Sequence, residues 1–225
     1  MKKIIYCACI YLVVLIFLTF CSHTTFSKEQ SKSKAWNNDP QKIPGKIQCE
    51  CYDFGGEGIA YHDNDSINNG SGKLNPANGT FLNEFRMKEG VDISYTKTGD
   101  IDDNKFNLVQ PLIGQLYVGW TVPGEWINYS VQIIESGKYN VSLMYTANGN
   151  GTISLSIDGK DVSGPLVILS THQDKDTVAW RQWHHWSLAE NIAKIELQKG
   201  FHILTLHTVA NGNMNYDWIE FKLNK

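Results

Sequence analysis

A strict alternation of side chains in one short stretch sets the fold class of this chain. In residues 138–146, large apolar side chains recur at every second position, and the pattern returns in residues 152–158. This period matches an extended strand, whereas a helix would need apolar residues every three or four positions. The apolar positions are Tyr139, Val141, Leu143, Tyr145, Ile153, Leu155 and Ile157. Both segments are expected to bury one face and leave the other in water.

The composition extends this pattern to most of the chain. It holds 7 Trp, 10 Tyr, 9 Phe and 19 Gly beside only 19% charged residues, which favours strands and turns over helices. The expected strands are the aromatic and β-branched segments 47–53, 91–95, 115–121, 126–133, 138–146, 152–158, 166–169, 182–188, 193–198, 201–209 and 216–222. No convincing helix separates them. The prediction is an all-β fold, a two-sheet antiparallel β-sandwich of the jelly-roll type.

Residues 1–21 are typical of an export signal. Lys2 and Lys3 precede an uncharged, mostly apolar run that Cys21 closes. The run is short of the ~20 apolar residues that a membrane-spanning helix needs, and polar residues follow it, so that alternative is disfavoured. We therefore expect an exported protein, either secreted or held at the outer cell surface.

The end of the signal leaves two routes open. Leu18-Thr19-Phe20-Cys21 resembles a bacterial lipoprotein cleavage site, although Phe20 stands where a small residue is usual. Cys21 would then carry a lipid, and this is the one expected route to a membrane. The alternative is ordinary secretion with cleavage a few residues further on. Removing residues 1–21 takes away two positive charges and changes the formal charge from −3 to −5.

The rest of the chain divides into a tether and one domain. Residues 22–43 are rich in Ser, Lys, Thr and Asn without apolar periodicity, which predicts a flexible tether and leaves Trp36 unexplained. Residues 44–225 would form the sandwich. Only Cys49 and Cys51 fall within it, and a disulfide between positions i and i+2 of a strand would be strained. We expect two small core residues instead of a bridge.

The charge pattern excludes nucleic acid as a partner. The chain has 20 Lys and Arg against 23 Asp and Glu, and it contains no basic run that could follow a phosphate backbone.

Two long polar stretches interrupt the strand pattern, at residues 64–80 and 97–112. They are expected to be loops at one end of the sandwich, where binding sites are commonly carried. Solvated insertions without a site are the alternative.

Seven sequence blocks, in order along the chain, resemble a known family. The blocks are Ile47–Asp53, Gly55–Asp63, Gly90–Ile93, Val118–Thr121, Gly124–Tyr129, Trp180–Trp183 and Asn215–Phe221. Together they resemble carbohydrate-binding module family 6, a jelly-roll module appended to polysaccharide-degrading enzymes. The resemblance covers residues 45–221. It implies non-catalytic binding of a polysaccharide or oligosaccharide by a monomer, with xylans, β-glucans, cellulose and algal galactans as candidate ligands.

The resemblance also implies a sugar site at a loop edge of the sandwich. Matching by motif gives Tyr117 and Trp180 as the two aromatic rings that hold a pyranose, and Asn215 as the polar anchor. The chemistry agrees, because sugar C–H faces pack on aromatic rings and an amide both donates to and accepts from hydroxyls. Four other tryptophans are expected in the core, because apolar residues flank them: Trp120, Trp126, Trp183 and Trp218.

A structural calcium ion is the second implication of the resemblance. In the family, such an ion ties the first strand to the last through oxygen ligands and main-chain carbonyls. Here the matching residues are Gln48 and Glu50, two positions apart on the first expected strand, and Asp217 on the last. Calcium takes 6–8 oxygen ligands, which suits this set. Ordinary polar residues at a sheet edge are the alternative.

The histidines give no metal or catalytic prediction. His184 and His185 are adjacent, and neighbours on a strand point to opposite faces, so one ion cannot easily hold both. His202 alternates with Leu204 and is expected as a hydrogen-bonded core residue, and His62 as a loop brace.

Two other functions stay open. A glycoside hydrolase would need two paired carboxylates, for which Glu57, Asp63, Glu125 and residues 100–103 are candidates that no pattern pairs. The chain leaves no room for a catalytic domain beside the binding module, so we expect no enzyme. A structural or interaction sandwich without a sugar site is the other alternative, and it predicts Trp180 buried and Tyr117 pointing into the core.

Overall fold

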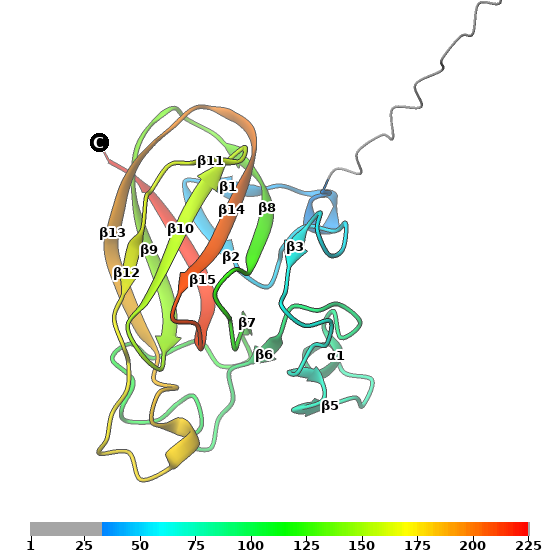
Figure 1. Cartoon of the computed structure of the whole chain (residues 1–225), viewed down its shortest axis with the longest axis vertical. Coiled ribbons are helices and arrows are strands. Elements are labelled where there is room, and N and C mark those ends of the chain that lie inside the picture. The colour runs from blue at the N-terminus through cyan, green and yellow to red at the C-terminus, as the bar shows by residue number, and fades with distance from the viewer. Residues whose placement is uncertain (1–32, 225) are drawn as a thin grey trace, which may run out of the picture. The chain divides into compact units, whose positions relative to one another are not determined.

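The computed structural model describes residues 33–224, in which two large β-sheets pack face to face beside a small two-stranded sheet (Figure 1). This confirms the predicted all-β sandwich. The expected export signal, Cys21 and residues 22–32 of the expected tether lie outside the described residues. Within the described part of the chain, no helix is long and apolar enough to cross a membrane.

The first sheet has seven strands. Its main path runs β1-β8-β14-β10-β11, with β3 paired to β8 and β12 paired to β10. Their bounds are β1 (Gln41–Ile43), β3 (Tyr61–His62), β8 (Trp126–Ile133), β10 (Gly151–Ile157), β11 (Lys160–Asp161), β12 (Leu166–Ile168) and β14 (Gly200–Ala210). The strands pair antiparallel except β1, which runs parallel to β8.

The second sheet has six strands, all paired antiparallel. Its path is β13-β9-β15-β7-β6, with β2 also paired to β15. The bounds are β2 (Gly45–Gln48), β6 (Ile93–Tyr95), β7 (Leu116–Val118), β9 (Gly137–Ala147), β13 (Ser187–Leu197) and β15 (Met214–Leu223). The C-terminal strand β15 therefore lies between β9 and the N-terminal strand β2.

The core lies between the sheets and is built from the alternating positions that the sequence predicts. The apolar residues of β8 and β9 point into it, and Tyr129, Tyr139 and Leu143 are fully buried. One expectation was wrong, because the other face of β9 is not left in water. Met144 on that face packs against Trp186, which is also fully buried.

The predicted strand over residues 182–188 is wrong for residues 182–186. A short 3₁₀ helix, η2 (Ala179–Arg181), and an irregular turn occupy this region, and β13 begins only at Ser187. Two side chains of this turn, those of His184 and Trp186, have a partner in the 97–112 loop, where both contact Asp102. Trp186 accepts two main-chain hydrogen bonds there, from the N–H groups of Leu108 (2.8 Å) and Val109 (3.1 Å).

Part of the predicted tether belongs to the folded domain. Residues 41–43 form β1, and the side chain of Ile43 is fully buried. Upstream of it, Trp36 in the 3₁₀ helix η1 (Trp36–Asn38) packs against Phe54 and Phe85, with ring centroids 4.9 and 5.2 Å apart. This polar segment is therefore held in the fold by apolar contacts with residues that lie further along the chain.

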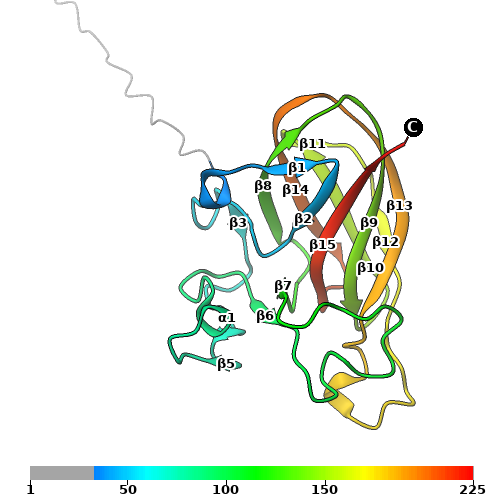
Figure 2. The same cartoon turned by 180° about the vertical axis from the view of Figure 1, so that it is seen from behind.

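The two polar stretches are ordered loops. Residues 64–80 contain β4 (Ser71–Gly72) and β5 (Asn75–Pro76), followed by the one-turn helix α1 (Phe81–Glu84). Residues 97–112 lie beside the segment that carries η2, at the same end of the sandwich in both views (Figures 1 and 2). Cys49 and Cys51 are free, the first buried and the second half-buried.

Candidate functional site

A pocket rich in aromatic side chains opens at the end of the sandwich where these loops meet. It has a volume of about 670 Å³. We call it the aromatic pocket, and it is lined by Leu74, Lys97, Ile101, Asp102, Tyr117, Trp120, Trp180, Trp183 and His184. Its walls come from both polar stretches, from β7 and from the segment around η2. The expectation that these loops gather at one end of the sandwich therefore holds in the structure.

Trp180 is the exposed ring of this pocket. It lies in the middle of η2 and is 56% exposed. Asp176 begins this turn, since its Oδ1 accepts the main-chain N–H of Val178 (3.0 Å). A large indole left in water on a fixed turn is available to a ligand.

A buried ion pair holds η2 in place. Arg181 donates from Nε to Oδ2 of Asp176 (2.6 Å) and from Nη2 to Oδ1 (2.9 Å). Its Nη1 donates to the carboxylate of Asp100 in the facing loop (2.7 Å), and His185 Nε2 contacts Asp176 Oδ2 (2.9 Å). The hydrogen bonds from Arg181 hold the pKa of the Asp176 carboxyl well below its usual range. The backbone under Trp180 is thereby tied to two loops.

Tyr117 lies at the floor of the aromatic pocket and is only 3% exposed. Its ring packs edge-on against Trp186, with centroids 5.2 Å apart. Burial raises the pKa of its hydroxyl well above the ordinary value, with a contribution from nearby Asp102. Tyr117 is therefore buried against Trp186 and is not a free-standing platform.

Asn215 lies behind the pocket, is 1% exposed and does not line it. Its Oδ1 accepts the main-chain N–H of Trp120 (3.0 Å). Its Nδ2 donates to Thr146 Oγ1 (2.8 Å) and to Nδ1 of His184 (2.9 Å). Both amide protons are used inside the protein, so neither is free to reach a ligand in this structure.

The four tryptophans that were expected in the core are only half-buried. Trp120 and Trp183, expected in the core, are half-buried and line the aromatic pocket. Trp120 has a left-handed backbone (φ 48°) in the bend after β7, and Trp183 belongs to the turn after η2. Trp126 and Trp218 are half-buried as well. The fully buried tryptophan is Trp186, which the sequence reasoning did not single out.

His184 was also missed as a pocket residue. Its Nε2 contacts Oδ1 of Asp102 (2.6 Å), an oxygen that also accepts the indole N–H of Trp186 (2.8 Å). Burial acts to raise the pKa of Asp102, but the hydrogen bonds from His184 and Trp186 hold it below its ordinary value. His184 and His185 have separate acidic partners, Asp102 and Asp176, and they lie in a turn and not on the strand that was expected.

A second group of buried carboxylates lies where β2 meets β15. Glu50 is 5% exposed and Asp217 is 2% exposed. Within residues 33–224, Glu50 Oε2 and Asp217 Oδ1 are buried without a hydrogen-bond partner. Gln115 Nε2 donates to Glu50 Oε1 (3.2 Å) and to Gln48 Oε1 (3.3 Å), which brings two of the three predicted residues together.

The pKa values of this pair are strongly raised. Burial raises the pKa of Glu50 to about 8, and the neighbouring Asp217 adds to the effect. Burial also raises the pKa of Asp217 to about 7, with Lys46 acting in the opposite direction. Glu50 lies in the turn after β2 and not on the strand as expected.

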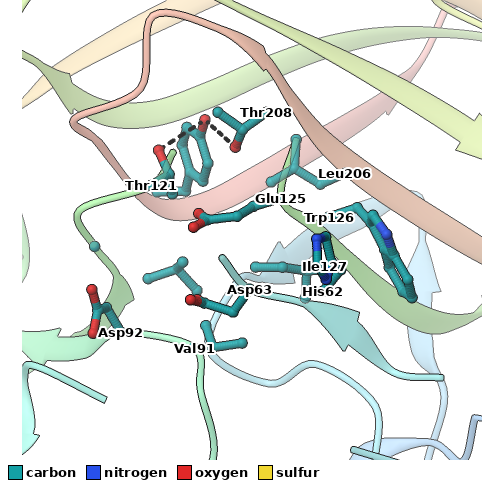
Figure 3. Close-up of a pocket in the computed structure, with 13 residues that line it drawn as sticks. His62, Asp63, Val91, Asp92, Thr121, Glu125, Trp126, Ile127, Leu206 and Thr208 are labelled. Atoms are coloured by element: carbon teal, nitrogen blue, oxygen red, sulfur yellow. Dashed lines mark hydrogen bonds between the residues drawn. The ribbon is translucent and has the colours of Figure 1, made fainter. Parts of the chain in front are cut away.

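A third group of carboxylates faces a small cavity between the sheets and the 63–69 loop. Figure 3 shows Asp63, Asp92 and Glu125 around it, and its volume of about 10 Å³ is roughly that of one water site. Burial raises the pKa of Asp63 to about 7 and that of Asp92 to about 6. Glu125 accepts the main-chain N–H of Val122 (2.7 Å), so it braces a turn. No sugar ring fits in this enclosed space.

A comparison with sequence families decides the class of this protein. The profile of the carbohydrate binding module (family 6) matches residues 89–223. The chain belongs to carbohydrate-binding module family 6. The match spans β6 to β15 and includes Tyr117, Trp180 and Asn215, whereas the first two blocks of the sequence resemblance lie before it. No curated protein matches the chain.

One solved structure shows the same fold, and a second is similar to a lesser degree. A family 6 module from Clostridium stercorarium, determined in complex with cellobiose, is 14% identical, with a TM-score of 0.51 over 83% of this chain and 98% of that one. A β-1,3-glucan-binding family 6 module from Bacillus halodurans is 14% identical, with a TM-score of 0.47 over 82% of this chain and 99% of that one. At these identities the likeness concerns the fold alone.

The calcium ion implied for family 6 fits the residues present at β2 and β15. Two buried carboxylate oxygens without partners are a costly arrangement unless a cation or a proton compensates them. Across residues 33–224, no three His, Cys, Asp or Glu side chains gather as a metal cluster. An ion here would therefore need Gln48 and main-chain oxygens beside Glu50 and Asp217, which suits calcium better than a transition metal.

Proposed function

We propose that this chain binds a polysaccharide or oligosaccharide without catalysis, in the aromatic pocket. The observation that carries the proposal is Trp180, a 56% exposed indole on a turn that a buried ion pair fixes beside a pocket of about 670 Å³. A large exposed ring on a rigid mount loses little conformational entropy when a ligand covers it. Membership of family 6, a family of non-catalytic binding modules, agrees with this function.

The binding energy comes mainly from aromatic surface. The C–H face of a pyranose stacks on Trp180, while Trp120 and Trp183 line the remaining wall and Tyr117 closes the floor. Covering each ring contributes roughly 1–3 kcal/mol at ~25 cal/mol per Å². Micromolar to millimolar dissociation constants are therefore expected for a single sugar-binding pocket.

Asn215 supports this pocket from behind. Its amide holds the left-handed main chain of Trp120 and the ring of His184 through the hydrogen bonds described above. This differs from the role that the family resemblance implies, a direct hydrogen bond to the sugar, because both amide protons already have protein acceptors.

β-Glucans, xylans and algal galactans are the proposed ligand classes. The candidates are xylans, β-1,3- and mixed-linkage glucans, cellulose and algal galactans. The relative from Clostridium stercorarium was solved with cellobiose, which makes β-glucans the first group to test.

We also propose a structural calcium ion held by Gln48, Glu50 and Asp217. Bound there, the ion would supply positive charge to two buried carboxylates and tie the strand that opens the second sheet to the C-terminal strand. Export by the signal over residues 1–21, with secretion or a lipid on Cys21, completes the proposal as a monomer that meets its glycan outside the cell.

A glycan array tests the function most broadly. The purified wild-type protein is expected to bind one class of the glycans named above and to release no reducing sugar from it. Loss of all binding across the array would contradict the proposal. Release of reducing sugar would establish a glycoside hydrolase instead.

A further inference from the structure

The orientation of the Asn215 amide dictates which nitrogen of His184 carries a proton. The main-chain N–H of Trp120 can only donate, so the atom of Asn215 that faces it must be the oxygen. The amide nitrogen then faces His184 Nδ1 and donates to it (2.9 Å). His184 Nδ1 therefore accepts, and the ring proton lies on Nε2, where it is donated to Asp102 (2.6 Å).

This chain of bonds has no place for a second proton on His184. A proton on Nδ1 would face the N–H of the Asn215 amide. Turning the amide by 180° would relieve that contact but would set its NH₂ group against the main-chain N–H of Trp120. Either arrangement leaves a buried donor without an acceptor, which is unfavourable. The network is consistent only with a neutral His184 protonated at Nε2.

We propose that His184 is a positioning residue whose neutral form holds the wall of the aromatic pocket, so that sugar binding weakens when His184 becomes protonated. The effect travels from His184 through Asn215 to the backbone of Trp120, a residue that lines the pocket. The binding part of this proposal rests on the proposed function, while the hydrogen-bond chain does not.

Other groups act on the same ring. Asp102 contacts Nε2 and attracts the protonated form, and Lys97, which lines the same pocket, opposes it. The rings of Tyr117, Trp183 and Trp186 surround His184 at centroid distances of 5.8, 5.6 and 5.7 Å and carry no charge at neutral pH. The Asn215 amide remains the contact that discriminates between the two forms.

The backbone of Trp120 is sensitive to this contact. Its φ of 48° lies in the left-handed region, which costs energy for a residue with a side chain. The main-chain N–H of Trp120 donates to the side chain of Asn215, at Oδ1. Gly119 next to it leaves room for this approach, since a Cβ there would lie 3.1 Å from Asn215 Oδ1. Loss of the bond is therefore expected to move the Trp120 indole.

Nuclear magnetic resonance of the wild-type protein tests the hydrogen-bond chain without a sugar. At about pH 8, ¹⁵N spectra of the histidine rings are expected to show His184 neutral with its proton on Nε2. On titration to about pH 5, the Trp120 amide signal is expected to shift with the same midpoint as the His184 ring. A proton on Nδ1 at pH 8, or a Trp120 amide that ignores the His184 titration, would overturn the proposal.

Affinity measurements test the consequence. The probes are cellohexaose, xylohexaose and laminarihexaose, measured by calorimetry at about pH 8 and about pH 5. A protein with the proposed function should bind at least one of them about tenfold more weakly at the lower pH, equivalent to about 1.4 kcal/mol. Equal affinity at both pH values would refute the coupling between His184 and sugar binding. Absence of binding at both pH values would refute the proposed function. In that case the Trp120 amide titration would still test whether the hydrogen-bond chain responds to His184.

Two variants separate His184 from other titrating groups. In His184→Gln, the new amide can accept a hydrogen bond from Asn215 and donate one to Asp102, as the histidine does, but it does not titrate. The pH effects on the Trp120 amide signal and on sugar affinity should therefore disappear. His172→Gln is the matched control, because His172 is a partly exposed histidine paired with Asp174 outside the pocket. A pH effect that persists in His184→Gln or vanishes in His172→Gln would contradict the assignment.

Discussion

Arg181 and Asp176, which lie on either side of the exposed Trp180 in the sequence, form a two-pronged ion pair with N–O distances of 2.6 and 2.9 Å. Both side chains are buried, at 7% and 0% exposure. Breaking such a pair leaves an uncompensated charge in the interior, at a cost of about 3–5 kcal/mol. The pair therefore joins the stability of the domain to the geometry of its candidate sugar site.

Replacing Arg181 with Met is expected to destabilise the domain by about 3 kcal/mol and to loosen the 3₁₀ helix η2, which carries Trp180. Denaturant unfolding measures the free energy, and glycan affinity measures the effect on the pocket. Lys222→Met is the matched control, because the Lys222 ammonium that pairs with Glu220 is exposed to solvent, and its loss should change stability much less than the loss of Arg181. Equal effects of the two substitutions would show that the Arg181 pair is not buried in solution.

Adding calcium to chelator-treated protein should raise its melting temperature. At a concentration about 100-fold above the dissociation constant, the expected gain is about 2.7 kcal/mol, or roughly 5–10 °C for a domain of this size. The variant Asp217→Asn should lose most of this gain. An unchanged melting temperature in wild type on calcium addition would remove the proposed ion.

The calcium effect should grow with pH. The folded-state pKa values of Glu50, about 8, and Asp217, about 7, lie above their ordinary values. Without calcium, these groups favour the folded state at low pH, and that contribution is lost as pH rises towards about 8. Calcium replaces the lost protons, so the difference in melting temperature should be larger at pH 8 than at pH 5.

Asp63→Asn should stabilise the domain at high pH and not at low pH. The pKa of Asp63 is raised from 3.8 to about 7, so the wild-type group favours the folded state below pH 4 and loses this contribution as pH rises to about 7. An amide cannot ionise and avoids that loss. Melting temperatures at pH 4 and pH 8 check this, and a variant that is less stable than wild type at pH 8 would contradict the burial of Asp63.

A chain that begins at Pro44 should be less stable than the longer one. This truncation removes Trp36, which packs on Phe54 and Phe85, and Ile43, which is fully buried in β1. Loss of one fully buried aliphatic side chain alone costs about 2–5 kcal/mol. Comparison with a chain that begins at Ser33 gives the measurement. Equal unfolding free energies would restore the interpretation of residues 33–43 as a tether.

The regular part of the fold was predictable because its signal is local. The predicted bounds of β8 match those of the structure, and the alternation at Tyr139 and Ile153 gave the sandwich class. The prediction failed where contacts with residues far away in the sequence determine the local structure. Residues 182–186 have the aromatic composition of a strand, yet Trp186 and His184 bond to Asp102 more than 80 residues away and the segment forms a turn.

The candidate site was predictable only in part for the same reason. Motif matching placed Tyr117 and Trp180 on one pocket, but flanking apolar residues could not show that Trp120 and Trp183 line it too. The left-handed backbone of Trp120 and the burial of Asn215 behind His184 arise from tertiary hydrogen bonds. The Gly119 that precedes Trp120 was the sole local hint of a close approach.

Titration calorimetry of three proteins against the glycan that the array identifies tests the central claim most directly. The proteins are wild type, Trp180→Ala and Phe201→Ala, in which Phe201 is a comparably exposed ring (57%) on β14, outside the aromatic pocket. We predict one binding site per chain, a loss of at least about tenfold in affinity for Trp180→Ala, which is about 1.4 kcal/mol, and wild-type affinity for Phe201→Ala. Binding by Trp180→Ala as tight as that of wild type would contradict the proposal that this pocket holds the sugar.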